Sequence, residues 1–475
     1  MRVHRSILAI AVLAVVLAAG CGSPVRYDLV IANGRVMDPA SGLDAVRSVG
    51  IQGGKVAAIS AGALQGSRTI DATGMVVAPG FIDLHEHGQN EESYGLMVRD
   101  GVTSALEIEV GTEDIAKWYA ARESGQIVNF GASIGHIRAR MRALHDPGTG
   151  LLPAGVGGSG VATEAQQQEM EGILRKGLAE GAVAVGFGSA YTPGANMAEI
   201  QRMFKVAAEG GASAHIHMRG GVAGLDSTIA AADAAGAKLH FVHINSSGDT
   251  ALTTFLAHIQ AARDKGQDVT TEAYPYGAGM TEITSALFDD WQTWPDAKFQ
   301  LHQLVSTGER LTRKRFGEAR KRGGTVIIHG RTEEQTREAI VSPLSMIASD
   351  GFIENGRGHP RTSGTYSKVL GKYVREEKAL TLMDALKKMT LMPAQRLEAR
   401  VPSMKEKGRL RVGADADVTI FDPATVRDRS TYEDATIPAA GIPFVVVGGQ
   451  VVVDSGKVTT ARPGKAIRAP LKASP

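Results

Sequence analysis

The stretch that most constrains the fold is residues 81–87, Phe-Ile-Asp-Leu-His-Glu-His, which follows an apolar run and a Pro-Gly break. On a strand the side chains alternate, so Asp83, His85 and His87 share one face. Two imidazoles spaced in this way can hold one metal ion, and catalytic zinc takes histidine nitrogens while keeping a position open for water. The simpler interpretation is an ordinary strand with two hydrogen-bonded histidines. Whether the two histidines bind a metal therefore depends on which side chains lie at the other strand ends.

The chain has 475 residues, enough for a large barrel with an appended domain. Its formal charge of +2 gives no indication of a nucleic-acid partner. It has one cysteine, so no internal disulfide can form.

The N-terminus predicts export. A basic start precedes the apolar residues 7–19, which are too few for a comfortable membrane span of about 20 residues. Leu17 to Cys21 looks like a bacterial lipobox, which predicts a lipoprotein signal peptide over residues 1–20 and a lipid anchor on Cys21. A conventional signal peptide with a chance cysteine is the alternative. The residue after Cys21 is Gly22 rather than aspartate. By resemblance to Gram-negative lipoproteins, this favours the outer membrane, facing the periplasm, if the source is Gram-negative.

Both chain ends predict short strands. We expect residues 21–77 and 406–475 to form one small β-sandwich domain, with a hairpin turn at Asn33-Gly34. Strands alternate with helices over residues 78–405, which predicts an α/β fold, a TIM (β/α)8 barrel. Residues 284–342 are too long for one connection and are interpreted as an insertion at the barrel mouth that could act as a lid. The eight candidate barrel strands lie around 81–87, 103–109, 127–136, 183–188, 212–217, 238–243, 268–274 and 345–350.

The chemistry of such barrels lies at the carboxyl ends of the strands. Several predicted strand ends carry side chains that can bind a metal. A single histidine at a strand end is usually structural, but a structural role does not readily explain a whole set of them. We therefore predict a site for one or two divalent ions, with zinc as the expected metal and Glu107 one layer below it. The predicted metal ligands are His85, His87, Glu109, His217 and His243, and Asp350 ends the eighth strand.

Other histidines have simpler interpretations. His215 fits a core position below His217. His240 lies three residues before His243, so on a strand the two side chains point to opposite faces, and His240 is interpreted as structural. His136 fits a packing role as well as a contact with ligands or substrate, and His329 lies in the insertion with neither role favoured.

These motifs resemble those of a protein superfamily and of one family within it. Residues 81–87 resemble the first-strand signature of the amidohydrolase superfamily, metal-dependent hydrolases built on TIM barrels. Over nearly all of residues 27–470 the chain resembles the N-acyl-D-amino-acid deacylases, or D-aminoacylases. The segments that carry this likeness are His-Pro-Arg-Thr-Ser-Gly-Thr at 359–365, Val-Leu-Gly-Lys-Tyr-Val-Arg-Glu-Glu at 369–377, Tyr-Thr-Pro at 191–193, His-Met-Arg at 217–219 and Tyr-Pro-Tyr at 274–276.

The resemblance implies roles for particular residues. His217 and His243 would hold a tightly bound zinc, and Asp350 would act as the general base. Tyr191 and Arg361 would hold the substrate carboxylate. The reaction implied is hydrolysis of an N-acyl-D-amino acid to a carboxylate and a D-amino acid.

The chain departs from the pattern in three places. Strand 182–188 lacks the lysine that bridges two metals in many amidohydrolases. Glu-Val-Gly at 109–111 replaces the Asn-Cys-Gly turn typical of the deacylases, so a carboxylate stands in for a thiolate and makes a harder site. His243-Ile244-Asn245 replaces a His-Leu-Lys sequence whose lysine helps to bind the carboxylate, so the substrate preference is less constrained than the reaction type.

Two alternatives remain open. Another amidohydrolase activity could act on a cyclic amide, as in dihydroorotases and hydantoinases, or on a dipeptide. A non-catalytic ligand-binding lipoprotein on the same barrel belongs to a different class, and the presence of Asp350 with the histidine set argues against it. The expected partners are a small-molecule substrate and the membrane, through Cys21.

Overall fold

The computed structural model describes residues 26–471. The predicted signal peptide and the lipidation site Cys21 lie outside the described residues. Within residues 26–471 no helix is long and apolar enough to cross a membrane.

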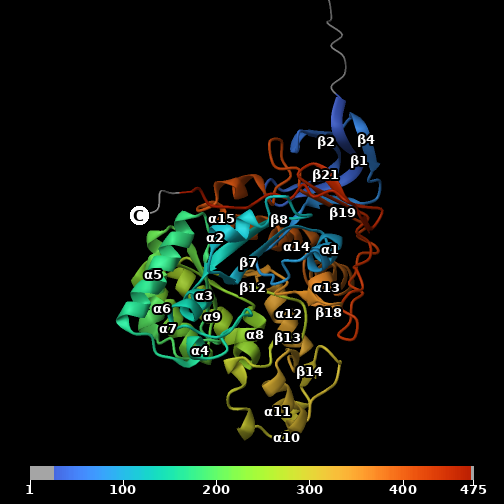
Figure 1. The fold of residues 1–475 in the computed structure, drawn as a ribbon. Coiled ribbons are helices and arrows are strands. Elements are labelled where there is room, and N and C mark those ends of the chain that lie inside the picture. Colours follow the sequence, from blue (N-terminus) through green and yellow to red (C-terminus); the bar gives the residue numbers. More distant parts are fainter. Residues whose placement is uncertain (1–25, 472–475) are drawn as a thin grey trace, which may run out of the picture.

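Eight parallel strands form the barrel that the sequence predicted (Figure 1). Each strand pairs with the next along the chain, and the strands are buried on both faces, which explains their apolar runs. In order they are β6 (Phe81–Asp83), β7 (Val102–Thr112), β8 (Asn129–Gly135), β9 (Val185–Gly188), β10 (Ser213–His217), β11 (Lys238–Phe241), β12 (Val269–Ala273) and β16 (Ser345–Ile347).

The barrel closes beyond the ends of its first and last strands. The Asp350 N–H donates to the His85 carbonyl at 2.6 Å, and the His87 N–H donates to the Gly351 carbonyl at 3.0 Å. Glu86 and Gly351 form a parallel bridge between these two segments. The residues that complete the barrel are therefore also residues of the predicted metal site.

Helices surround the barrel (Figure 1). The capping box predicted at Thr163 and Gln166 is present and starts α5, since the Thr163 hydroxyl accepts from the Gln166 N–H. The principal helices are α1 (Glu91–Arg99), α2 (Ile115–Ala120), α3 (His136–Ala143), α5 (Glu164–Ala179), α6 (Met197–Glu209), α7 (Gly221–Ala235), α9 (Leu252–Asp264), α12 (Glu333–Val341), α13 (Arg361–Lys368), α14 (Leu382–Met389) and α15 (Leu391–Glu398).

The two chain ends form one nine-stranded mixed sheet, seen at the top of Figure 1. The hairpin predicted at Asn33-Gly34 is wrong, because β1 runs through it as one strand. Asn33 adopts φ 62° and the pairing with β2 shifts there, so the turn-forming dipeptide makes a bulge instead. The strands are β1 (Arg26–Asp38), β2 (Leu43–Gln52), β3 (Lys55–Ser60), β4 (Gln65–Asp71), β5 (Val76–Pro79), β19 (Val418–Phe421), β20 (Phe444–Val447), β21 (Gln450–Asp454) and β22 (Lys457–Val458).

The insertion forms its own small body at the opposite end of the molecule (Figure 1). It begins at β13 (Ala278–Glu282), slightly before the predicted start, and pairs this strand with β15 (Thr325–His329). β15 pairs in turn with β14 (His302–Leu304), next to α11 (Arg313–Arg322). Aromatic side chains give it a separate core, with Phe288, Trp294, Phe299 and Phe316 among its members.

A buried ion pair joins the barrel to the terminal sheet. Asp417 Oδ2 accepts from Lys407 Nζ at 2.7 Å and from Asn129 Nδ2 on β8 at 2.9 Å. Asp417 Oδ1 accepts from the Gly448 N–H in the β20–β21 turn at 2.8 Å. One carboxylate thus holds elements from both domains.

We predict that Asp417→Ala lowers the free energy of unfolding by about 3 kcal/mol, because it leaves the buried Lys407 ammonium with Asp415 alone and removes the acceptor of Asn129 and of the Gly448 N–H. Urea-induced unfolding measures this. Asp44→Ala is the control, since Asp44 pairs with Arg35 at an exposed position and its loss should cost below about 1 kcal/mol. Equal losses in the two variants would contradict the role of Asp417.

Candidate metal centre

A bulge in β7 places Glu109 at the centre of the barrel mouth. Residues 108–111 of β7 lie opposite the single residue Ser133 of β8. Gly111 has φ 67°, and a Cβ there would lie 2.4 Å from Ser133 Oγ, so glycine is required. The bulge breaks the regular alternation and redirects the side chains next to it, as bulges near active sites do.

His85 and His87 are held in the orientation of metal ligands. His85 Nδ1 lies 2.5 Å from Glu272 Oε1, and His87 Nδ1 lies 2.6 Å from Glu107 Oε2. A carboxylate at Nδ1 keeps a proton on that nitrogen and leaves the Nε2 lone pair free for a metal. The two Nε2 atoms lie 3.1 Å apart and 2.8 and 3.2 Å from Glu109 Oε2, so they converge on one point.

A second pair of histidines converges on the other oxygen of Glu109. Oε1 lies 2.9 Å from His217 Nδ1 and 3.9 Å from His243 Nε2. Two groups of potential ligand atoms result, each with its atoms within 4.8 Å of one another: His85, His87, Glu109 and Asp350 in one, and Glu109, His217 and His243 in the other. Glu109 belongs to both groups, so its position suits a bridge between two ions.

Asp350 and His243 sit in unusual backbone conformations. Their φ angles are 52° and 32°, in the left-handed region that non-glycine residues seldom adopt. Asp350 Oδ1 lies 3.4 Å from Nε2 of both His85 and His87. Asp350 Oδ2 lies 2.7 Å from Arg361 Nη1. One oxygen therefore faces the cluster while the other is paired with a buried guanidinium.

The electrostatics of the cluster keep Glu109 ionised and His243 neutral. At His85 and His87, by contrast, burial is outweighed by the surrounding carboxylates, which raise the pKa of both imidazoles well above its ordinary value. Burial would raise the pKa of the Glu109 carboxyl, but His85, His217 and His87 outweigh it and hold that pKa well below its ordinary value. Burial, reinforced by His217, lowers the pKa of His243 to about 3 and keeps its imidazole neutral. An ionised carboxylate and a neutral imidazole are the forms that ligate metal ions.

The structure brings all five predicted ligands and Asp350 together. Tyr191 lies beside them, with its ring centroid 4.6 Å from that of His217. Arg361 is fully buried and lines neither cavity of the site. Its predicted contact with the substrate carboxylate therefore stays a prediction, because its guanidinium pairs with Asp350.

The remaining histidines stand apart from the ligand groups. His215 is buried one layer below and bonds Ser213 at 3.0 Å. His240 bonds Glu272 at 3.0 Å, and His136 bonds Glu199 at 2.8 Å. His329 lines a cavity of the site but bonds Gln303 at 2.9 Å.

Sequence reasoning missed Glu272, and it placed Glu107 one layer below the ligands, where its carboxylate contacts His87 Nδ1. Glu272 lies on β12 and contacts both His85 and His240. Burial would raise the pKa of its carboxyl, but His85 and His240 lower it to about 2. A lone acid within a strand buried on both faces was the available signal, as it had been for Glu107.

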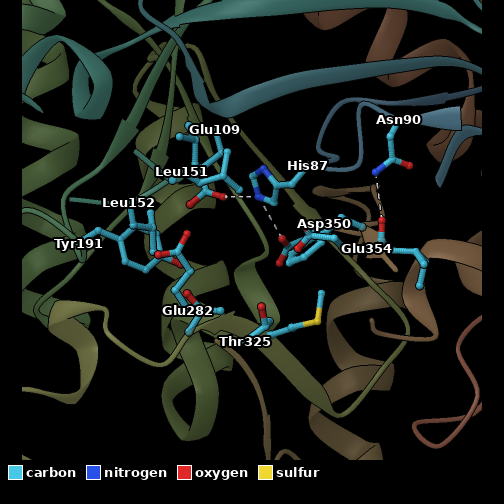
Figure 2. A pocket seen from close by; sticks show the side chains of 16 residues that line it. His87, Asn90, Glu109, Leu151, Leu152, Tyr191, Glu282, Thr325, Asp350 and Glu354 are labelled. Atoms are coloured by element: carbon cyan, nitrogen blue, oxygen red, sulfur yellow. Dashed lines mark hydrogen bonds and ion pairs between the residues drawn. The ribbon is translucent and has the colours of Figure 1, made fainter. Parts of the chain in front are cut away.

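Two cavities meet over the cluster. Figure 2 shows the first, of about 310 Å³, with His87, Glu109 and Asp350 on one side and Tyr191 and Glu282 on another. The second, of about 380 Å³, is lined by residues that include His217, His243 and Arg331. Tyr191, Met280, Thr281 and Asp350 line both cavities. A substrate can therefore extend in two directions from the ligand groups.

This donor set of imidazoles and carboxylates fits zinc or another divalent transition metal. The barrel and the donor set together define a metal-dependent hydrolase. The chain matches the model of the Amidohydrolase family over residues 68–453, and it belongs to that family.

Its relatives include N-acyl-D-amino-acid deacylases. It is 32% identical to N-acyl-D-glutamate deacylase of Alcaligenes xylosoxydans xylosoxydans, over 93% of this chain and 97% of the relative. The N-acyl-D-glutamate deacylase of Bordetella bronchiseptica, solved with zinc and a phosphonate that mimics the tetrahedral intermediate, is 25% identical with a TM-score of 0.82, covering 94% and 100% of the two chains. A D-aminoacylase structure with a binuclear metal centre is 25% identical with a TM-score of 0.78, covering 93% and 100%.

We predict that Glu272→Gln weakens metal binding by about 10- to 100-fold, because the variant loses the charge that fixes the proton on His85 Nδ1. Competition with a chelator, followed by elemental analysis, measures the affinity. Glu199→Gln removes another buried acid that bonds a histidine, away from the cluster, and should keep the affinity. An unchanged affinity in Glu272→Gln would show that His85 needs no partner at Nδ1.

Proposed function

We propose that this protein hydrolyses N-acyl-D-amino acids to a carboxylate and a D-amino acid. The observation that carries the proposal is the convergence of Glu109 and Asp350 with two histidine pairs where two cavities meet. The deacylase relatives support the substrate class and its D configuration.

In this proposal His217, His243 and Glu109 hold one ion, and His85, His87 and Glu109 can hold a second. A bound divalent ion would supply a Lewis acid for the amide carbonyl and a water activated near neutral pH. Asp350 takes the proton of the attacking water on Oδ1 and later delivers it to the leaving amine. Arg361 holds Oδ2, so the same carboxylate oxygen stays directed at the reacting groups throughout.

The proposal gives Glu109 the place of the cysteine in the related deacylases. A carboxylate offers two oxygens, and here each faces a different histidine pair. It also makes a harder site than a thiolate, which favours tolerance of manganese and similar ions alongside zinc.

We expect Glu109→Gln to lose most of the bound metal, because it keeps the size of the side chain but removes the shared negative charge. Glu109→Cys should regain zinc binding and shift the preference from manganese towards zinc. Metal titration of the metal-free protein measures both. Glu107→Gln is the comparison, since Glu107 contacts only His87 of the ligands and its loss should be milder. Retention of full metal content by Glu109→Gln would overturn this role.

Asp350→Asn should reduce kcat by about 10²- to 10⁴-fold with the metal content nearly intact, because it removes the proton carrier. A panel of N-acetyl-D- and L-amino acids, cyclic amides and dipeptides, assayed with added zinc, provides the substrates and separates the alternative activities. Activity within a few-fold of the wild type would assign the base elsewhere. Wild-type turnover of the cyclic amides alone would overturn the proposed substrate class.

A further inference from the structure

Arg331 places a positive charge in the second cavity, and the proposed mechanism gives this residue no role. It follows β15 in the insertion and lines the second cavity together with His217 and His243. Among the residues lining the two cavities in the described part of the chain, it is the one lysine or arginine.

The guanidinium of Arg331 is held in place by neutral groups. Nη2 donates to the Tyr274 hydroxyl at 2.8 Å, and Nη1 donates to Ser246 Oγ at 3.3 Å. Nε is buried without a hydrogen-bond partner. Within residues 26–471 Arg331 forms no ion pair with a carboxylate within 4.0 Å, although Asp249 and Asp350 line the same cavity. A planar cation in this state is suited to binding a carboxylate.

The other candidates for that task are engaged elsewhere. Arg361 is paired with Asp350 at 2.7 Å. Asn245 is fully buried and donates to the Tyr274 carbonyl at 3.0 Å. Asn245 therefore supports the backbone of Tyr274, whose hydroxyl accepts from Arg331. Gly279 lies beside this pair, where a Cβ would come within 3.3 Å of the Tyr274 hydroxyl.

The first cavity differs in that no lysine or arginine lines it, while Asp350 lines both cavities and Asp249 lines the second. Glu282 lines it, and burial raises the pKa of that carboxyl. Glu354 also lines it, with Leu151, Leu152 and Val110 as apolar neighbours. A substrate carboxylate would meet these two acids there, whereas an acyl chain would contact the apolar side chains.

We propose that Arg331, supported by Tyr274 and Ser246, binds the α-carboxylate of the substrate in the second cavity, while the acyl group occupies the first. This inference rests on the proposed deacylase function and fixes the direction of the substrate across the site. It assigns the carboxylate contact to the insertion rather than to Arg361.

Kinetics on paired substrates test the assignment. The pairs are the N-acetyl derivatives of D-leucine, D-methionine and D-glutamate and the matching C-terminal α-amides, which lack the α-carboxylate, with acetate release as the measurement. Arg331→Met should raise KM for the acids by about 10- to 100-fold with kcat within a few-fold, because a charged hydrogen-bond donor is lost. The KM for the amides should stay nearly constant, and Arg331→Lys should recover part of the affinity for the acids.

Binding to an inactive background gives a second measurement. In Asp350→Asn, Arg331→Met should weaken the binding of the N-acetyl-D-amino acids, measured by calorimetry, and leave that of the amides unchanged. Arg322→Met is the matched control, since Arg322 is an exposed arginine of the same insertion. It should match the wild type in both measurements.

Equal affinity of Arg331→Met and the wild type for the acids would overturn the assignment and leave the deacylase function standing. An equal loss for acids and amides would also overturn it, because it would indicate a structural effect. Failure of the wild type to hydrolyse any N-acyl amino acid would overturn the proposed function itself.

Discussion

The arrangement of this molecule depends on one buried carboxylate. Glu109 is 2% exposed and lies between two histidine pairs at the inner wall of the first cavity. A charge in such a place is stable only with matching charges and hydrogen-bond partners around it. The imidazoles of His85, His87 and His217 face its two oxygens and supply these partners. A divalent ion held by these ligands would supply compensating positive charge.

The same contacts complete the barrel and the site. His85 supplies a carbonyl that accepts from the Asp350 N–H where the first and last strands meet. The left-handed backbone at Asp350 is thus held by a hydrogen bond across the closure. The terminal sheet stabilises the opposite side through Asp417, and the insertion contributes cavity walls. The contacts that close the barrel therefore also position His85, His87 and Asp350.

Much of this was predictable from the sequence. Alternating strands and helices indicated the barrel, and the carboxyl ends of parallel strands have to meet at one face. His85, His87 and His217 could be placed there by their positions at strand ends, and His215, which shares the face of His217, lies two residues deeper in the barrel. The order of the strands along the chain equals their order in the barrel, so no long-range information was needed.

Local patterns determined which side chains point to the barrel mouth, and only the tertiary structure decided which of them meet. The contact of Glu272 with His85 joins β12 to β6, residues distant in sequence. The pairing of Arg361 with Asp350 and the exposure of Arg331 to the cavity depend on how α13 and the insertion pack over the barrel. At Asn33-Gly34 the paired strand overrode a strong turn signal. Periodicity is a property of a few neighbouring residues, whereas register, closure and loop packing are set by contacts across the whole chain.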